Sequence, residues 1–108
     1  MIQPANDSHT GPIFPVQPFS SESEAIERAN ATNCGLGASV WGKDVERAER
    51  VGQQIEAGTV WINSWGKPDP RGFMGGFKES GMGGEYSVQG LIAYTNPQCM
   101  HTWKTEMK

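Results

Sequence analysis

The residues of this chain whose side chains are best suited to act as nucleophiles are two cysteines, Cys34 and Cys99. A thiolate attacks carbonyl carbon well when a nearby base or a helix N-terminus lowers its pKa. His101 follows Cys99 by two residues, so on a strand the two side chains would share a face. Such a pair often arises by chance, and Cys34 has no histidine near it in the sequence. Buried or inert thiols are the favoured interpretation, and we expect no catalytic residue here.

The segment from Ser64 to Gly84 is rich in glycine and contains Lys78, which suggests a cradle for a phosphate group. The spacing argues against this, because Lys78 stands between Phe77 and Glu79 and not in the Gly-Lys-Ser/Thr order of a P-loop. A dinucleotide fingerprint also fails, since Tyr86 stands where its last glycine belongs. Packing or turn formation is the favoured role. Neither cysteine has a second Cys or His at the spacing of a structural metal site, so no metal is expected.

Helices and strands that could position these residues are indicated by capping patterns and periodicity. Ser21 and Glu24 form a capping box that predicts a helix over 22–31, and Asp44 can cap a second helix that Gly58 would end. The buried face of the second helix would be Val45, Ala48, Val51 and Ile55. A third helix is predicted over 85–94. Strands are predicted near 13–19, over 36–41 and 59–63, and over 98–103.

Alternation of strand and helix predicts an α/β fold with a mostly parallel sheet, interrupted by the long Gly-rich loop at 64–84. Its 108 residues suffice for one small domain, and 36% hydrophobic content with 14 Gly and 7 Pro indicates much loop. The net charge of -3 offers no basic stripe, which argues against nucleic acid as a partner. No stretch resembles a leader peptide or a membrane span. We therefore expect a cytoplasmic protein that does not associate with a membrane.

Several segments, in order and at matching spacing, resemble the C-terminal part of the catalytic domain of NAD(P)-dependent aldehyde dehydrogenases. The resemblance covers about 11–104, and its most specific parts are Glu56 to Asn63, Gly75-Gly76 with Lys78, Ser80-Gly81, and Gly90-Leu91 with Tyr94-Thr95. It divides the chain into a frayed N-terminus at 1–12, a partial catalytic domain at 13–97, and a tail at 98–108 that is similar to the family's oligomerisation segment.

The resemblance implies enzymes in which a cysteine thiolate attacks an aldehyde, hydride passes to NAD or NADP, and a glutamate activates water to release the acid. That cysteine, that glutamate and the cofactor domain have no counterpart in the matched segments. Cys34 stands where the family more often has tyrosine. The family's Glu-x-Phe before Gly-Pro, which holds the nicotinamide ribose, is replaced by Ser8-His9-Thr10. We therefore expect no cofactor to be bound by this chain alone.

The segment from Ser64 to Met74 matches the family segment that lines the aldehyde tunnel. Trp65, Pro68 and Phe73 are thus the candidate substrate-tunnel residues, although they can also be read as loop aromatics and a turn proline.

Three hypotheses remain open. The first is an aldehyde dehydrogenase-like protein that is truncated and not catalytic alone, and the second is an interaction module that pairs with a full-length aldehyde dehydrogenase subunit. The third is an inert remnant or gene-model fragment. In each case the apolar faces of the helices need another surface to pack against, so the isolated chain should expose apolar side chains.

Overall fold

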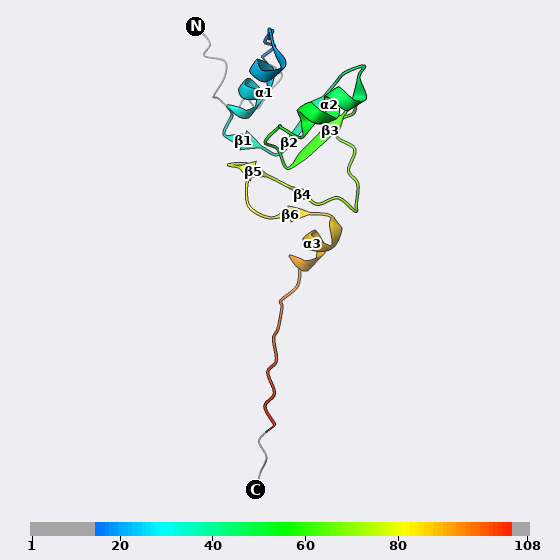
Figure 1. Ribbon diagram of the computed structural model, residues 1–108. Coiled ribbons are helices and arrows are strands. Elements are labelled where there is room, and N and C mark those ends of the chain that lie inside the picture. The colour runs from blue at the N-terminus through cyan, green and yellow to red at the C-terminus, as the bar shows by residue number, and fades with distance from the viewer. Residues whose placement is uncertain (1–14, 105–108) are drawn as a thin grey trace.

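The computed structural model describes residues 15–104, and these form an α/β arrangement, as the sequence predicts (Figure 1). The predicted N-terminal segment at 1–12 lies outside the described residues. The elements follow one another along the chain as α1 (Glu22–Asn30), β1 (Cys34–Gly35), β2 (Gly37–Val40), α2 (Val45–Gly52), β3 (Thr59–Ile62), β4 (Met74–Gly75), β5 (Phe77–Lys78), β6 (Gly84–Glu85) and α3 (Ser87–Ile92).

The first two helices begin where their capping residues predict. The Ser21 hydroxyl accepts a hydrogen bond from the Glu24 amide at 3.2 Å, and the Glu24 carboxylate accepts one from the Ser20 amide at 2.8 Å. Asp44 Oδ1 likewise accepts from the Arg47 amide at 3.0 Å. These bonds satisfy amides that have no partner within a helix, which fixes the starts of α1 and α2.

The centre of the fold is the parallel pair of β2 and β3, with α2 packed on one face. Gly37 lies opposite Thr59 and Val40 opposite Ile62 in the register of the two strands. Gly52 of α2 comes so close to the strands that a side chain there would meet Val60 and Ile62. Ala48, 4% exposed, is the one buried hydrophobic residue among those described. The predicted apolar face of α2 is therefore only partly buried, since Val45 is half exposed.

Several sequence predictions need correction. β1 with β5 and β4 with β6 are antiparallel, so the mostly parallel sheet is limited to β2 and β3. The segment 64–84 is not wholly irregular, because β4, β5 and the first residue of β6 lie in it. The third helix is shorter than predicted, since Glu85 belongs to β6 and Tyr86 has a φ of 61° that cannot continue a helix.

The two outer strands that the sequence predicts are absent from the described residues: 15–19 and 98–103 belong to no sheet. The prolines in 13–19 remove amide donors, and 98–103 has no neighbouring strand to pair with.

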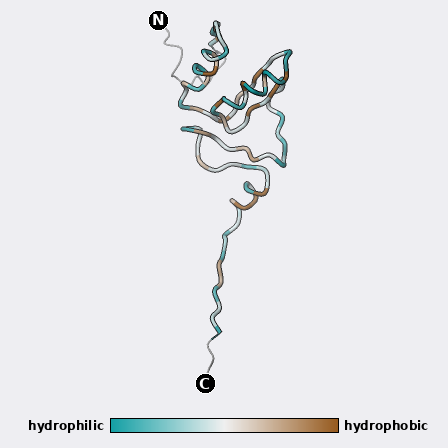
Figure 2. The backbone as a smooth tube through the Cα atoms, in the orientation of Figure 1, coloured by the Kyte–Doolittle hydropathy of each residue, from teal (hydrophilic) through white to brown (hydrophobic). Residues whose placement is uncertain are grey.

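The described chain is elongated, and it exposes much apolar surface. It measures 81 × 35 × 23 Å, with a radius of gyration of 20.6 Å, whereas a compact domain of 100 residues has about 13 Å. The stretch after α3 runs away from the folded part (Figure 1), and Figure 2 shows hydrophobic residues on α3 where this stretch begins. Six apolar or aromatic side chains of α3 and the following stretch are more than half exposed: Val88, Leu91, Ile92, Tyr94, Met100 and Trp103. Within the described residues, no helix is long and apolar enough to cross a membrane.

Gly58, which immediately precedes β3, provides a test of this packing. A β-carbon at Gly58 would overlap the carbonyl of Gly75, so Gly58→Ala must push the 75–81 turn away from β3. We expect a loss of roughly 1–3 kcal/mol, as for other overpacked sites, measured by urea unfolding followed by circular dichroism. Gly72→Ala is the matched control, because a β-carbon there meets nothing closer than 3.6 Å. Equal urea midpoints for the two variants would contradict this packing.

Candidate functional site

The chain segment that follows β3 is held in place by side chains of the strand itself. Asn63 lies just after β3 with a φ of 50°, and its amide group both accepts from the Gly42 amide and donates to the Gly42 carbonyl, each at 2.8 Å. Trp61 Nε1 donates to the carbonyl of Lys67 at 3.0 Å. Together these bonds fix where the 64–73 segment leaves the strand and how it folds back over Trp61.

This segment forms one wall of a groove of about 450 Å³, which we call the aromatic groove. It is lined by Leu36, Gly37, Trp61, Trp65, Gly66, Pro68, Met74 and Tyr86. A second hollow of about 200 Å³ adjoins it, shares Trp61, Pro68, Met74 and Tyr86, and adds Phe73 and Asp69 among others. The three sequence-predicted residues Trp65, Pro68 and Phe73 are thus brought to one surface, while their role as tunnel residues stays a prediction.

Phe73 is positioned by glycines on the β4–β6 pair. Its ring lies so close to Gly75 and Gly84 that a side chain at either would collide with it. The ring therefore rests on bare backbone, which leaves its other side available to the hollow, and Phe73 is 42% exposed. Trp65 is 75% exposed, so the mouth of the groove presents a large aromatic surface to solvent.

An Asp69–Arg71 pair shapes the loop below the groove. Asp69 accepts from the Arg71 amide and from its guanidinium, at 2.9 to 3.0 Å. These hydrogen bonds, with the charge of Arg71, lower the pKa of Asp69 from 3.8 to about 2. The next residue, Pro70, accepts from the Ser87 amide at 2.9 Å, which ties the loop to the first residue of α3.

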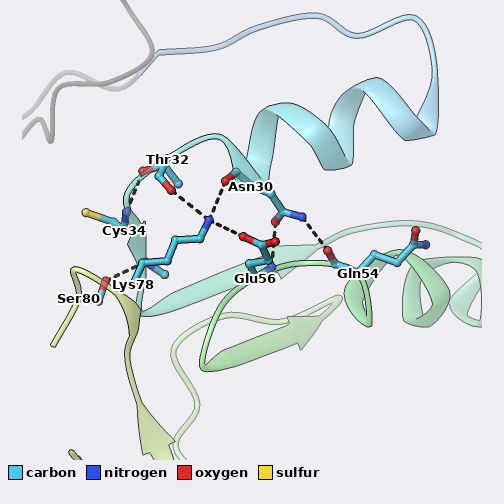
Figure 3. A network of polar contacts seen from close by, with 8 residues as sticks. Asn30, Thr32, Cys34, Gln54, Glu56, Lys78 and Ser80 are labelled. Atoms are coloured by element: carbon cyan, nitrogen blue, oxygen red, sulfur yellow. Dashed lines mark hydrogen bonds and ion pairs between the residues drawn. The ribbon is translucent and has the colours of Figure 1, made fainter. Parts of the chain in front are cut away.

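Lys78 fastens the glycine-rich turn to the end of α1 (Figure 3). Its ammonium group lies 2.7 Å from Glu56 Oε2 and donates to the carbonyls of Asn30 at 2.6 Å and Thr32 at 3.0 Å. Asn30 also accepts from the Glu56 amide and donates to the Gln54 carbonyl, both at 2.8 Å. The Lys78 ammonium group is therefore fully paired within the protein, and its side chain is 25% exposed.

The same contacts bear on the phosphate cradle that the glycine-rich sequence suggests. A phosphate cradle needs backbone amides and a cation that are free to face the anion. Here the Glu79 amide donates to Asn33, the Ser80 amide to Phe77, and the Gly35 amide to the Ser80 hydroxyl. With Lys78 also paired, these groups are engaged within the protein, which is consistent with the packing role that the sequence favours; whether the chain binds a cofactor stays a prediction.

The cysteines do not line the aromatic groove. Both are exposed, so of the interpretation as buried or inert thiols only the burial is wrong. Cys34 belongs to β1 and does not line the groove. Cys99 lies on the stretch that runs away from the folded part, with its sulfur 3.2 Å from His101 Nε2. Neither thiol is therefore among the residues that line the aromatic groove.

Among the residues that line the aromatic groove or the adjoining hollow, sequence reasoning missed Trp61, which it assigned to the core, and also Met74, Asp69 and Tyr86. Trp61 carried a usable signal, since strand alternation puts it on the face opposite Val60 and Ile62. The Asp69–Arg71 spacing also gave a sequence signal, because an Asx side chain often accepts a hydrogen bond from the backbone amide two residues on. Tyr86 carried none, as its position depends on the pairing of β4 with β6.

Comparisons with known proteins place this geometry in a family. The model of the aldehyde dehydrogenase family matches residues 3–100. The 2-hydroxymuconic semialdehyde dehydrogenase of Pseudomonas putida is 51% identical over 85 residues, covering 79% of this chain and 18% of the relative. The betaine aldehyde dehydrogenase of Bacillus subtilis is 47% identical over 85 residues, covering 79% of this chain and 17% of the relative.

A solved structure is similar as well. The betaine aldehyde dehydrogenase of Staphylococcus aureus in complex with NAD+ superposes with a TM-score of 0.74 at 36% identity, over 88% of this chain and 21% of that one. The chain thus spans about a fifth of the length of the relatives that it matches.

The Asp69–Arg71 pair gives a direct test of the loop geometry. Arg71→Gln removes the bonds that favour the charged carboxylate, so the pKa of Asp69 should rise from about 2 toward 3.8, measured by NMR titration of its side-chain carboxyl carbon. The lowered pKa means that the pair contributes stability above pH 3.8 and loses it as the pH falls through about 2. Arg47→Gln, which breaks a separate pair with Glu22, is the control. An unchanged Asp69 titration in Arg71→Gln would refute the loop geometry.

Proposed function

Because the chain belongs to the aldehyde dehydrogenase family, we propose that its aromatic groove forms part of the wall along which such an enzyme guides an aldehyde. We further propose that the chain does not oxidise aldehydes by itself. The observation that carries the proposal is the convergence of Trp65, Pro68 and Phe73 around Trp61 on one surface.

The wall would act by binding and orientation. Flat aromatic rings and a proline bury the hydrocarbon part of an aldehyde, at about 25 cal/mol for each Å² of apolar surface removed from water. The groove has few polar groups, so it would leave the carbonyl group to be oriented by residues outside it. Aldehydes with an apolar or aromatic body are the substrate class that such a surface favours.

The proposal that the chain is not active alone rests on the placement of its nucleophiles. Attack on a carbonyl requires a thiolate within a few ångströms of the bound aldehyde. Cys34 and Cys99 do not line the groove, and Lys78 is held by Glu56 and two carbonyls. The family's NAD or NADP would have to be bound by another part of the enzyme. A cytoplasmic location belongs to the same proposal, since two exposed free thiols suit a reducing compartment.

We expect the purified chain, incubated with an aldehyde panel and either nicotinamide cofactor, to produce no reduced cofactor by absorbance. Turnover that is lost on mutating Cys34 or Cys99 to serine would disprove the inactivity of the isolated chain. The wall is tested separately, in a chimera that carries this chain's matching segment in place of that of the Pseudomonas putida relative. In an active chimera, Trp65→Ala and Phe73→Ala should each raise KM for an aromatic aldehyde by about tenfold, the loss of roughly 1.4 kcal/mol of binding, with kcat nearly unchanged.

Trp41→Ala is the matched control for these substitutions. Trp41 is 66% exposed and lines a different groove, between α1 and α2, so it should leave KM unchanged. If all three variants behave alike in an active chimera, the aromatic groove has no part in binding aldehydes.

A second candidate function is pairing with a full-length aldehyde dehydrogenase subunit. The observation that favours it is the apolar surface of α3 and the following stretch, where Leu91 is 68% and Trp103 88% exposed. A surface of this kind is typical of sites that contact another protein.

This candidate predicts that the chain co-sediments with such a relative, and that Leu91→Asp weakens the association by at least about tenfold, since a charge would be buried without a partner. Val16→Asp, which alters an exposed apolar residue elsewhere, should have no such effect. A chain that sediments alone in the presence of the relative argues against pairing.

A further inference from the structure

The Cys99–His101 pair has a feature that neither the fold nor the proposed function explains. The sulfur of Cys99 and Nε2 of His101 lie 3.2 Å apart on the same side of an extended stretch, and Cys99 is exposed. A thiolate and an imidazole are the two side chains that Zn²⁺ prefers. At a tetrahedral zinc ion, bonds of about 2.3 Å to sulfur and 2.0–2.1 Å to nitrogen put the two ligand atoms about 3.5 Å apart. A shift of a few tenths of an ångström would make the pair a chelate.

Two ligands are half of a tetrahedral site. Among residues 15–104, no group of three or more His, Cys, Asp and Glu side chains could hold a metal ion. The missing pair must therefore come from outside the described part of the chain.

A second copy of the chain can supply that pair. In the described structure, the backbone of 96–104 belongs to no sheet and forms no hydrogen bond, so its amides and carbonyls are available to another strand. If two copies pair antiparallel about Met100, Cys99 of each lies opposite His101 of the other. Residues 99 and 101 share one face of a strand, and directly opposed side chains have β-carbons about 4.5–5.5 Å apart. All four ligands then lie together on one face of a two-stranded ribbon.

We propose that Cys99 and His101 are a metal half-site, and that a divalent zinc-like ion joins two copies of this chain through a site of two sulfurs and two nitrogens. Binding one ion releases the thiol proton of each Cys99 to solvent and leaves each imidazole neutral, with no oxidation or reduction. The Met100 side chain, 78% exposed, points to the other face of the ribbon and does not obstruct the ion.

The test uses the full 108-residue chain, reduced and freed of metal. With Zn²⁺, the mass from analytical ultracentrifugation should double, at one ion per two chains, and EDTA should reverse the change. This reversal separates metal bridging from association through apolar surface. Co²⁺ as a probe should give a thiolate charge-transfer band together with the intense visible bands of a tetrahedral site.

Cys99→Ser and His101→Ala should each abolish both the doubling and the tetrahedral cobalt spectrum. Cys34→Ser is the matched control, because Cys34 is the other exposed thiol and should be replaceable without effect. Metal binding at one ion per chain without a change in mass would overturn the two-copy site. A cobalt spectrum that Cys99→Ser leaves intact would overturn the assignment of its ligands.

Discussion

The contact on which the rest of this structure depends is the close approach of the 75–81 turn to the corner between α1 and β3. Gly58 and Gly75 meet with no room for a side chain, and the Gly58 amide donates to the Gly35 carbonyl at 3.0 Å. Lys78 closes the same corner, with a φ of 54° and three oxygen partners. The strained backbone and the desolvated ammonium are offset by this full set of partners. Because the turn is held here, β4 and β6 pair where Phe73 can face the hollow that adjoins the aromatic groove.

The side chains of β3 point to two opposite faces. Those on one face pack against α2, and Trp61 on the other lines the aromatic groove. Val60 and Ile62 point toward Gly52 of α2, whereas Trp61 points the opposite way and lies against Gly37. The alternation of a strand makes this unavoidable, since successive side chains lie on opposite faces. A change in register by one residue would exchange the helix-packing and groove-lining sets. The segment that most resembles the family is therefore the one that sets both the helix and the aromatic surface.

Local signals in the sequence predicted α1, the start of α2 and β3, because capping bonds at Ser21 and Asp44 and the β-branched content of 59–62 act within a few residues. The end of α2 was predicted wrongly, since the helix stops at Gly52 and not at Gly58. The antiparallel pairs were not predictable, since Gly35 pairs with Phe77 across more than 40 positions through a contact that only the assembled fold defines. The predicted strand at 98–103 failed for the complementary reason: its apolar residues have the right propensity, but the described structure offers no strand to pair with. Of the groove, sequence resemblance indicated Trp65, Pro68 and Phe73. The supporting bond from Trp61 to Lys67 depends on tertiary structure.

Few side chains are buried in the described part of this chain, so its geometry depends on contacts other than a packed core. A radius of gyration of 20.6 Å and a single buried hydrophobic residue among those described mean that local hydrogen bonds and close glycine contacts, and not a packed core, define this geometry. Both partners of each of these contacts lie within the described residues. Neither thiol lines the aromatic groove, the surface on which the proposed function depends. Both proposals of function, and the metal half-site on the extended stretch, therefore concern surfaces through which this chain would contact other molecules.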